Sequence, residues 1–532
     1  MPYRRKKEKW QKKRRMRIAM LWEACYNQNR KTDQAGAGKP PEGECGMEHF
    51  EPTFESLYHY ETPDWLRDGK FGIWSHWGPQ SVPMFGDWYA RNMYIQGQPQ
   101  YEYHLRHYGH PSKFGYKDLC ALWKAEKFDP DALMAKYYRA GARYLMTQAT
   151  HHDHFFNYDS KINRMNSVNV GPGKDILALW KAAADKYHLP FGISEHLGAS
   201  FSWWRVNKGC DKTGPYAGVP YDGNDPAYQD FYHANQEHGT GEELDPWYTG
   251  NERFRDYWLK CVNEMIDRFQ PDLLYSDGVL PFGDHWLAEQ GALNDLSVYD
   301  RGLQAVARLY NTSIEKYGDN RAVYLQKDRR KEIYSVGVLD IEKSQLPGIM
   351  PEPWHTDTCI GNWFYDVHHP YKSPEQIVEM LVDIISKNGI MLLNILQRPD
   401  GTIDEDAEFI LDRLADWFAV NSEAVYGTRP WRIFGEGETR VKIDGFTEEK
   451  TDWNLSDVRF VQKEGAVYAF LLGAKGGETV TLRSFAEDDV KSVELLGYGP
   501  AEFRKDFGVL AVKLPEKLPS FCANTLKIEI NS

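Results

Sequence analysis

Cysteine is scarce in this sequence, and long apolar runs are missing from it. The seven cysteines are odd in number and widely scattered, with no CxxC pair, so we predict neither a disulfide scaffold nor a zinc ribbon. No apolar run is long enough to cross a bilayer. The segment IAMLWEACY (18–26) is too short and too polar to be the apolar part of a secretory signal. We therefore expect a cytoplasmic protein with no membrane partner.

Positive charge is also in short supply. The net charge of −13 at pH 7 argues against a nucleic-acid partner, because phosphate binding needs a basic surface. The exception is the basic run MPYRRKKEKWQKKRRMR (1–17), which is followed by the Gly/Pro-rich segment QAGAGKPPEGECG (34–46). We interpret residues 1–50 as a solvated basic tail and linker. Contact of the tail with an anionic polymer or a membrane surface is the alternative.

Aromatic residues, in contrast, are plentiful. They make up 14% of the 532 residues, with 18 Trp and 32 Tyr. A large core explains part of this content, because aromatic side chains dominate core packing. Flat aromatic faces also pack against the C–H faces of sugars, so the composition gives modest support to sugar binding.

Apolar runs typical of strands alternate with amphipathic segments from about residue 51. This alternation predicts βα units and a parallel sheet, and about seven or eight units predict a (β/α)8-type barrel over residues 51–431. Short alternating strands with Gly turns then predict a C-terminal antiparallel β-sandwich over residues 432–532. The runs of the barrel are FGIWSHW (71–77), RYLMTQAT (143–150), LPFGISEH (189–196), DLLYSD (272–277), RAVYLQK (321–327), SVGVLDIE (335–342) and GIMLLNIL (389–396).

Polar side chains stand where these runs end. In such barrels the chemistry lies at the carboxyl ends of the strands, so we expect these side chains to converge on one mouth. They are His76, His151, His152, His196, Asp277, Lys327, Glu342 and Asn394.

Two of these side chains are carboxylates that suit glycoside hydrolysis. Asp277 ends one run, where it could cap the following segment or act as a nucleophile. Glu342 ends another run, and Asp340 two residues earlier shares its face if the strand continues; an ion pair with Lys343 is the alternative for Glu342. Glycoside hydrolysis requires one carboxylate that attacks the sugar or activates water, and one carboxyl group that protonates the leaving oxygen.

The segment THHDHF (150–155) holds three histidines in five residues, His151, His152 and His154. Such a cluster suits a metal ion, and neutral histidines equally hydrogen-bond to sugar hydroxyls, so both interpretations stay open. A metal would take further ligands from other strands, namely His76, Asp277 and Glu342.

Asp87 and Trp88 stand side by side in GDWYARNMY (86–94). A Trp face beside a hydrogen-bonding carboxylate is typical of a sugar-binding site. A loop anchored by a buried Trp is the structural alternative.

Four segments, in this order, resemble motifs of glycoside hydrolase family 29, the α-L-fucosidases. They are GKFGIWSHWGPQSVPMFGDWYARNMY (69–94), HHDHF (151–155), PDLLYSDG (271–278) and NGIMLLNILQRPDGTIDEDAEFILDRLADWFAVNSEAVYGTRPW (388–431). The resemblance runs from about residue 51 to 431. It implies a retaining exo-hydrolase that removes terminal α-L-fucosyl groups from fucosylated oligosaccharides or glycoconjugates through a covalent glycosyl-enzyme intermediate, with no metal and no cofactor.

The resemblance also implies roles for the two carboxylates. Asp277 takes the place of the family's nucleophile. The acid/base lies about a dozen residues before a Trp in the family, and counting back from Trp354 leads to Glu342. Glu352 and Asp340 are the rival positions. Carried across in the same way, the side chains that bind fucose hydroxyls, its ring face or its methyl group are His76, Asp87, Trp88, His151, His152, Tyr275 and Trp363.

Three departures from the family pattern put the sugar and the linkage in question. His355 follows Trp354 where the family commonly has Glu. LQKDRR (325–330) replaces a strand end that usually carries Arg, so Lys327 or Arg329 takes that role. GISEH (192–196) lacks the usual Tyr, and His196 substitutes for it. α-L-Galactose is therefore an alternative sugar, because a pocket that merely tolerates its extra hydroxyl discriminates by about 100-fold or less. A sugar-binding protein without catalysis, and a metal-dependent barrel hydrolase, are alternatives of other kinds.

Overall fold

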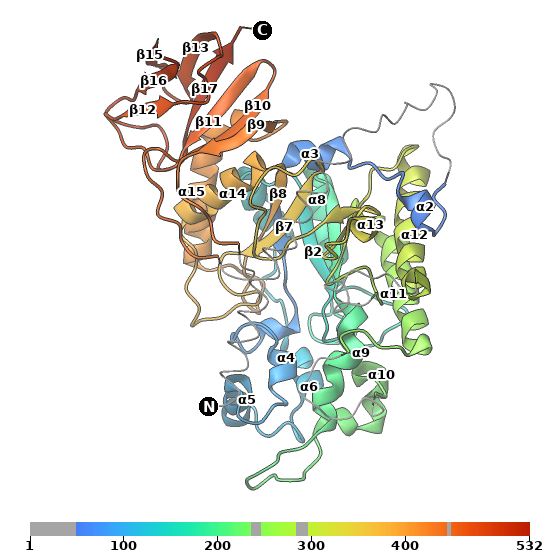
Figure 1. The fold of residues 1–532 in the computed structure, drawn as a ribbon. Coiled ribbons are helices and arrows are strands. Elements are labelled where there is room, and N and C mark those ends of the chain that lie inside the picture. Colours follow the sequence, from blue (N-terminus) through green and yellow to red (C-terminus); the bar gives the residue numbers. More distant parts are fainter. Residues whose placement is uncertain (1–48, 236–245, 284–295, 444–447, 532) are drawn as a thin grey trace, which may run out of the picture.

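The computed structural model describes residues 49–235, 246–283, 296–443 and 448–531 (Figure 1). The predicted basic tail, residues 1–50, lies almost entirely outside the described residues. The predicted fold class is confirmed: an eight-stranded parallel sheet curls into a barrel, and antiparallel sheets follow it. The barrel strands are β1 (Phe71–Ser75), β2 (Leu145–Thr150), β3 (Phe191–Glu195), β4 (Leu273–Ser276), β5 (Val323–Gln326), β6 (Val338–Leu339), β7 (Trp354–Cys359) and β8 (Gly389–Asn394).

The strand order is β6-β5-β4-β3-β2-β1-β8-β7, so strands adjacent in the sheet are also consecutive in the chain, except that the first strand, β1, pairs with the last, β8. β6 and β7 stand at the two ends of this order, and a parallel bridge between Asp340 and His355 joins them. Every residue of the eight strands is buried. Such two-sided burial is typical of parallel strands that helices cover on the outside.

The helices of the outer layer begin at residues that suit helix starts. Asp129, Asp175, Asn251, Ser373 and Asp404 each accept a backbone N–H of the first turn, which satisfies a donor that has no partner within the helix. The long helices are α7 (Pro130–Arg139), α8 (Ile176–Lys186), α11 (Glu252–Phe269), α12 (Asp300–Tyr317), α14 (Pro374–Ser386) and α15 (Glu405–Asn421).

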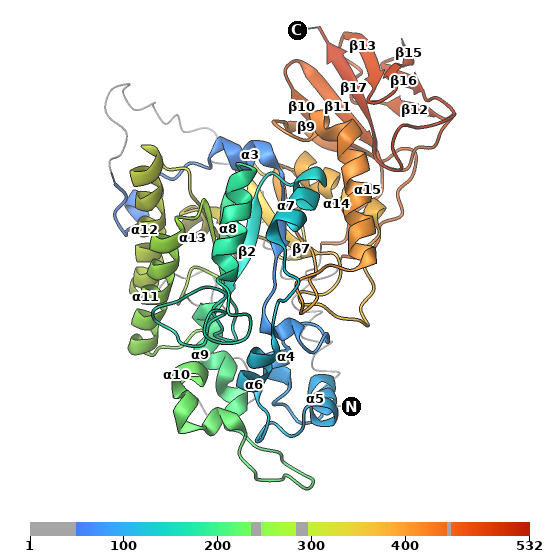
Figure 2. The ribbon, with the colours of Figure 1, turned by 180° about the vertical axis from the view of Figure 1, so that it is seen from behind.

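Shorter helices gather at the end of the barrel opposite the C-terminal sheets, as both views show (Figures 1 and 2). Those that follow β1 are α4 (Tyr89–Asn92), α5 (Pro99–His107) and α6 (Tyr116–Leu122), and those that follow β3 are α9 (Ser200–Trp203) and α10 (Gln229–Tyr232). This end is therefore the one where the strands finish. Three more short helices are α2 (Phe54–Leu57), α3 (Asp64–Gly69) and α13 (Lys331–Tyr334).

β7 was missing from the strands that the sequence predicted. Its sequence, WHTDTC, is largely polar, yet all six residues are buried. The polar side chains have partners inside the protein: His355 Nδ1 lies 2.6 Å from Asp340 Oδ1, and the Thr356 hydroxyl donates to the carbonyls of Ile341 and Ser344. An apolar-run criterion misses such a strand because its burial depends on hydrogen bonds instead of hydrophobicity. Residues 340–353, all of them described, connect β6 to β7 without a helix.

The C-terminal domain packs two antiparallel sheets around a core that includes Trp431, Phe460 and Phe485. One sheet has the order β14-β13-β17-β11-β10-β9 and the other β12-β16-β15. The strands are β9 (Arg429–Glu436), β10 (Val458–Lys463), β11 (Ala466–Leu471), β12 (Thr479–Leu482), β13 (Val490–Leu495), β14 (Gly499–Pro500), β15 (Glu502–Asp506), β16 (Val509–Lys513) and β17 (Asn524–Ile530).

A buried ion cluster fastens this domain to the barrel. Arg459 on β10 pairs with Asp383 on α14, and Lys387 at the end of α14 lies 2.7 Å from the other oxygen of Asp383. All three side chains are at most 4% exposed, so both buried cations depend on Asp383 for compensation.

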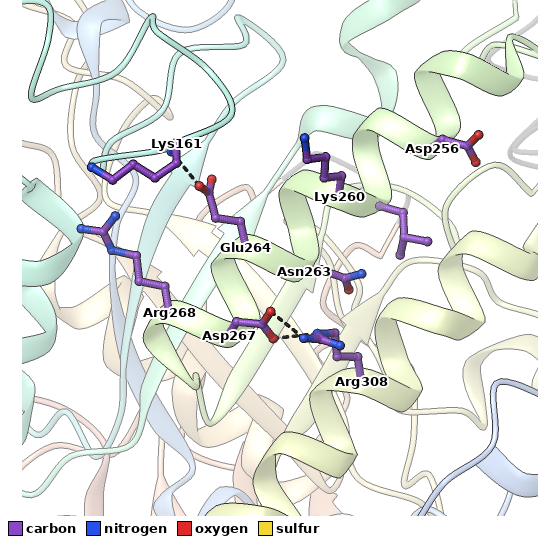
Figure 3. A pocket seen from close by; sticks show the side chains of 9 residues that line it. Lys161, Asp256, Lys260, Asn263, Glu264, Asp267, Arg268 and Arg308 are labelled. Atoms are coloured by element: carbon purple, nitrogen blue, oxygen red, sulfur yellow. Dashed lines mark hydrogen bonds and ion pairs between the residues drawn. The ribbon is translucent and has the colours of Figure 1, made fainter.

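A groove of about 740 Å³ lies on the outer helical layer beside α11 and α12 (Figure 3). Most of its charged side chains have partners: Arg308 makes two bonds to Asp267, Arg268 lies 2.6 Å from Asp175, and Glu264 accepts the backbone N–H of Lys161. The groove is thus a surface feature of the helices and is separate from the strand ends. Among the described residues, no helix combines the length and apolarity needed to span a bilayer.

Candidate active site

The polar residues predicted at the strand ends do meet at one mouth. His76 directly follows β1, His151 and His152 follow β2, and His196 follows β3. The ring centroid of His76 lies 5.1 Å from that of His151 and 5.2 Å from that of His196. Asn394, the last residue of β8, accepts the backbone N–H of His76 and donates to the carbonyl of Trp363, so it ties the loop after β7 to the end of β1.

Lys327 lies between the two predicted catalytic carboxylates. Its Nζ is 2.6 Å from Asp277 Oδ1 and 2.6 Å from Glu342 Oε2. These two oxygens are therefore at most twice that distance apart, which is shorter than the separation of about 6.5–9.5 Å in inverting glycosidases and allows the closer pair of retaining ones. The side chains of Asp277 and Glu342 are 17% and 18% exposed, so both border the solvent-accessible mouth.

The surroundings shift the pKa values of the two carboxyl groups in opposite directions. Burial alone would raise the pKa of Asp277, but the Lys327 ammonium, followed by His196 and His152, outweighs it and holds that pKa well below its ordinary value. Burial raises the pKa of Glu342, and the negative charges of Asp357 and Asp277 add to the rise while Lys327 only partly opposes it. A pair of carboxyl groups tuned in this way provides an ionised group and a proton donor at one pH.

Two histidines contact the second oxygen of Asp277. His152 Nε2 lies 3.2 Å and His196 Nδ1 lies 3.5 Å from Oδ2. His152 Nδ1 also donates to the carbonyl of His196 at 2.6 Å, so His152 makes both bonds only when both of its nitrogens carry protons. Burial lowers the pKa of His196 to about 4. Lys327 is therefore the main positive charge beside Asp277.

Aromatic side chains form one wall of the mouth. Trp363, in the loop after β7, donates its indole N–H to Glu342 Oε1 at 3.1 Å. Trp74 on β1 lies with its ring centroid 5.5 Å from that of Trp363 and 5.2 Å from that of Tyr275. The sequence analysis did not single out Trp74, although its position two residues before His76 on a strand places both side chains on one face.

Trp88 lies near two further aromatic residues that were not predicted for the site. Its ring stacks on Trp247 with centroids 6.3 Å apart and meets Trp203 edge-on at 6.1 Å. Trp88 adopts a left-handed backbone conformation with φ of 58°, which is uncommon for a bulky residue and is typical of functional loops. Nothing in the sequence near residues 203 and 247 signalled this contact.

Several buried polar atoms of the site have no hydrogen-bond partner among the described residues. They include both ring nitrogens of His76, Nε2 of His196 and Oδ1 of Asp87. Burial raises the pKa of Asp87 to about 7. Buried polar atoms are nearly always satisfied, so these atoms indicate a polar ligand such as a sugar with several hydroxyls.

The geometry permits two groups of metal ligands, but the hydrogen bonds do not favour them. His151, His152 and His196, and likewise His76, Asp87 and His151, place candidate ligand atoms within 4.8 Å of one another. However, Gln80 accepts the backbone N–H of Ala90 and so presents its NH₂ group to His151 Nδ1 at 2.9 Å. The proton of neutral His151 then sits on Nε2, where it can donate to a hydroxyl instead of coordinating a metal.

The third histidine of the THHDHF segment points away from this cluster. His154 Nδ1 is 2.8 Å from the carbonyl of Phe231, and its Nε2 is 2.8 Å from the hydroxyl of Tyr257. Both ring nitrogens therefore have structural partners. The sequence could not distinguish His154 from its neighbours, because the chain turns through a left-handed conformation at this residue (φ of 62°).

The rival acid/base residues lie in unsuitable surroundings. Glu352 is half exposed and pairs with Lys331 at 2.7 Å on the surface. Asp340 is fully buried and bonded to His355. That bond also accounts for the histidine at position 355, where the family commonly has Glu. At this position of β7 the side chain meets a carboxylate, Asp340, at the end of the neighbouring strand.

A barrel whose strand ends carry two carboxylates at this separation is that of a glycoside hydrolase. The α-L-fucosidase family model matches residues 43–423, and the chain belongs to this family. The tissue α-L-fucosidase of Rattus norvegicus is 26% identical to it over 488 residues, which cover 90% of this chain and 91% of the relative. The α-L-fucosidase of Branchiostoma floridae is 24% identical and covers 85% of this chain and 88% of the relative.

Solved structures share the fold. An α-L-fucosidase superposes with a TM-score of 0.70 at 24% identity, over 90% of this chain and all of that chain. The Thermotoga maritima α-fucosidase in complex with fucose superposes with a TM-score of 0.68, also at 24% identity and over 90% of this chain and all of that chain.

Proposed function

We propose that this protein is a retaining exo-α-L-fucosidase that hydrolyses terminal α-L-fucosyl linkages of oligosaccharides or glycoconjugates. The proposal rests mainly on Asp277 and Glu342. Both lie 2.6 Å from the ammonium group of Lys327, and their pKa values are shifted in opposite directions. Membership of the family supports the choice of fucose.

In the first step Asp277 attacks the anomeric carbon and forms a covalent glycosyl-enzyme bond. Glu342 gives its proton to the oxygen of the leaving group as the glycosidic bond breaks. In the second step Glu342, now ionised, takes a proton from water, and the resulting hydroxide oxygen displaces Asp277 as a carboxylate. Two inversions at the anomeric carbon leave its configuration unchanged.

The remaining predicted residues bind the sugar in this proposal. His76, Asp87, His151 and His196 present ring nitrogens and a carboxylate to its hydroxyls, whereas His152, which was also predicted to bind the sugar, contacts the nucleophile at Asp277 Oδ2. Trp88 offers a ring face, and Trp363 with Tyr275 supplies an apolar patch for the methyl group of fucose. Lys327 occupies the place of the family's arginine and keeps Asp277 ionised.

The proposal is tested with aryl α-L-fucoside and aryl α-L-galactoside as substrates for the wild type and Asp277→Ala. We expect a strong preference for the fucoside and a loss of several orders of magnitude in the variant. Added azide should restore turnover of the variant and yield β-fucosyl azide, because a small anion enters the space that the carboxylate leaves. Lack of fucoside hydrolysis by the wild type would refute the proposal. Preference for the galactoside would show that the enzyme acts on α-L-galactose instead of fucose.

The acid/base is tested with Glu342→Gln and with Glu352→Gln as the matched control. Glu342→Gln should slow substrates with poor leaving groups far more than activated aryl fucosides, because activated leaving groups need little protonation. Glu352→Gln should behave as the wild type, because Glu352 pairs with Lys331 away from the mouth. The opposite pattern would move the assignment to Glu352.

A further inference from the structure

A second pair of carboxyl groups lies directly beneath the catalytic pair. Asp357 on β7 and Asp340 after β6 are each 1% exposed, and the charge of Asp340 raises the pKa of Asp357. Asp340 Oδ1 faces His355 Nδ1 at 2.6 Å, and Asp357 Oδ2 accepts from the Tyr275 hydroxyl at 3.0 Å. Among the described residues, the other two oxygens, Asp340 Oδ2 and Asp357 Oδ1, have no donor.

One shared proton resolves this arrangement. A proton shared by the two carboxyl groups would provide a donor for the oxygens that have none. Two adjacent buried carboxyl groups cannot both ionise at low cost, so the pair holds a single negative charge. Lys327, directly after β5, and His355 on β7 both lower the pKa of Asp357.

The Tyr275 hydroxyl connects this pair to the catalytic site. Its oxygen lies 3.0 Å from Asp357 Oδ2 and 3.2 Å from Asp277 Oδ1. A tyrosine has one O–H to donate, so it serves one of the two acceptors at a time. An ionised oxygen is the stronger acceptor, with bonds roughly twice as strong as those to a neutral group.

We propose that Asp357 is a positioning residue whose proton directs the Tyr275 hydroxyl to Asp277. While Asp357 is protonated, Asp277 is the charged acceptor and receives the bond. When Asp357 loses its proton, its own ionised oxygen competes for the hydroxyl at the shorter distance, and Asp277 loses a donor. The proposal rests on the role of Asp277 proposed above.

The charges around Asp357 place this change at mildly alkaline pH. Burial raises the pKa of Asp357 to about 8, the charge of Asp340 adds to the rise, and Lys327 and His355 oppose it. The charge of Asp357 also raises the pKa values of Glu342, Tyr275 and Tyr144. A bond from Tyr275 stabilises the carboxylate that forms again when Asp277 leaves the glycosyl-enzyme, so its loss slows turnover as the pH rises.

The test compares kcat for an activated aryl fucoside against pH for the wild type, D357N, Y275F and the double variant, because kcat includes the step in which Asp277 leaves the glycosyl-enzyme. Asparagine does not ionise, its NH₂ can donate to Asp340, and its carbonyl stays a neutral acceptor. We expect the ratio of D357N to wild-type kcat to rise about fivefold between about pH 6.5 and about pH 9, the value of one ordinary hydrogen bond. In the Y275F background, D357N should leave the shape of the profile unchanged.

Two further measurements separate this role from a merely structural one. Asp222→Asn is the matched control: burial raises the pKa of Asp222 to about 6, and Asp222 accepts from Tyr94 and Tyr232 away from the mouth, so the profile should keep its shape. Infrared difference spectra should show a protonated carboxyl band that disappears as the pH passes about 8 and is absent from D357N.

The outcomes distinguish the two proposals. A pH effect of D357N that persists in Y275F would overturn the link through Tyr275. Absence of the infrared band in an active wild type would overturn the shared proton and leave the fucosidase proposal intact. An inactive wild type that shows the band would refute the fucosidase proposal instead. If D357N does not fold, the pH profile of Y275F tests the proposal. This variant should lack the decrease in turnover that loss of the Tyr275 bond causes in the wild type at alkaline pH.

Discussion

The indole N–H of Trp363 donates to Glu342 at 3.1 Å, while Lys327 holds the other oxygen of the same carboxyl group at 2.6 Å. Both oxygens of Glu342 thus have a fixed donor, although the residue lies in a loop three positions beyond β6. Because Asn394 holds the Trp363 carbonyl, the orientation of Glu342 depends on contacts with the loop after β7 and with the end of β8.

Trp363→Phe should lower kcat for poor leaving groups by about tenfold, because a lost hydrogen bond to a charged group is worth about 1.5–3 kcal/mol, part of which Lys327 retains. The ring would keep its packing on Trp74. Loss of a donor to the ionised form also raises the pKa of Glu342, so the alkaline limb of kcat should move to higher pH. A variant that changes only KM would show that Trp363 binds the sugar without orienting Glu342.

Lys327→Met should reduce kcat/KM by about 100-fold or more and move the acid limb of the pH profile upward by about one to three units. The sign follows from Asp277, which must be ionised to attack: without the ammonium, only His196 and His152 oppose the effect of burial, so the pKa of Asp277 rises. Lys331→Met, which removes a surface partner of Glu352, is the control and should leave the profile in place. An acid limb that does not move would mean that the histidines, not Lys327, keep Asp277 ionised.

Dialysis against a chelator should leave fucoside hydrolysis unchanged. The reason is the proton that Gln80 fixes on His151 Nε2, which blocks one ligand position of both candidate metal groups. The measurement is kcat before and after treatment, with zinc added back. Activity that is lost and then restored by zinc would contradict the proposal and support a metal-dependent hydrolase.

Asp383→Ala should lower the free energy of unfolding by about 3–5 kcal/mol, because it leaves Arg459 and Lys387 buried without a counter-charge. Asp412→Ala, which breaks an exposed pair with Arg139, is the control and should change stability by about 1 kcal/mol or less. Urea unfolding measures both. Equal effects of the two substitutions would show that the buried cluster contributes no more than a surface pair.

The same cluster predicts a pH dependence of stability. Burial alone would raise the pKa of Asp383, but Lys387 and Arg459 outweigh it and hold the pKa below its ordinary value. A carboxyl group with a lowered folded-state pKa stabilises the protein above its unfolded pKa, about 3.9. This stabilisation is lost as the pH falls through the lowered value, so the stability difference between wild type and Asp383→Ala should shrink at acidic pH.

Much of the fold followed from the sequence because seven strands are apolar and end in polar residues. The same rule located His76, His151, His152, His196, Asp277 and Lys327, because carboxyl ends of parallel strands share one edge. It could not find β7, whose burial depends on partners such as Asp340 that are distant in the sequence. The rule also does not predict that Lys327 lies between Asp277 and Glu342. Such a contact depends on how the ends of three separate strands are placed relative to one another.

Arg459 has a consequence for how separable the two domains are. This arginine belongs to the C-terminal sheet, yet it neutralises a carboxylate within the helical layer of the barrel. The barrel's own Lys387 also pairs with Asp383, so the dependence runs from the C-terminal domain to the barrel: Asp383 is the carboxylate that compensates the buried Arg459. Any homologous barrel joined to these C-terminal sheets would have to supply a carboxylate at the position of Asp383, so the two domains are constrained to change together.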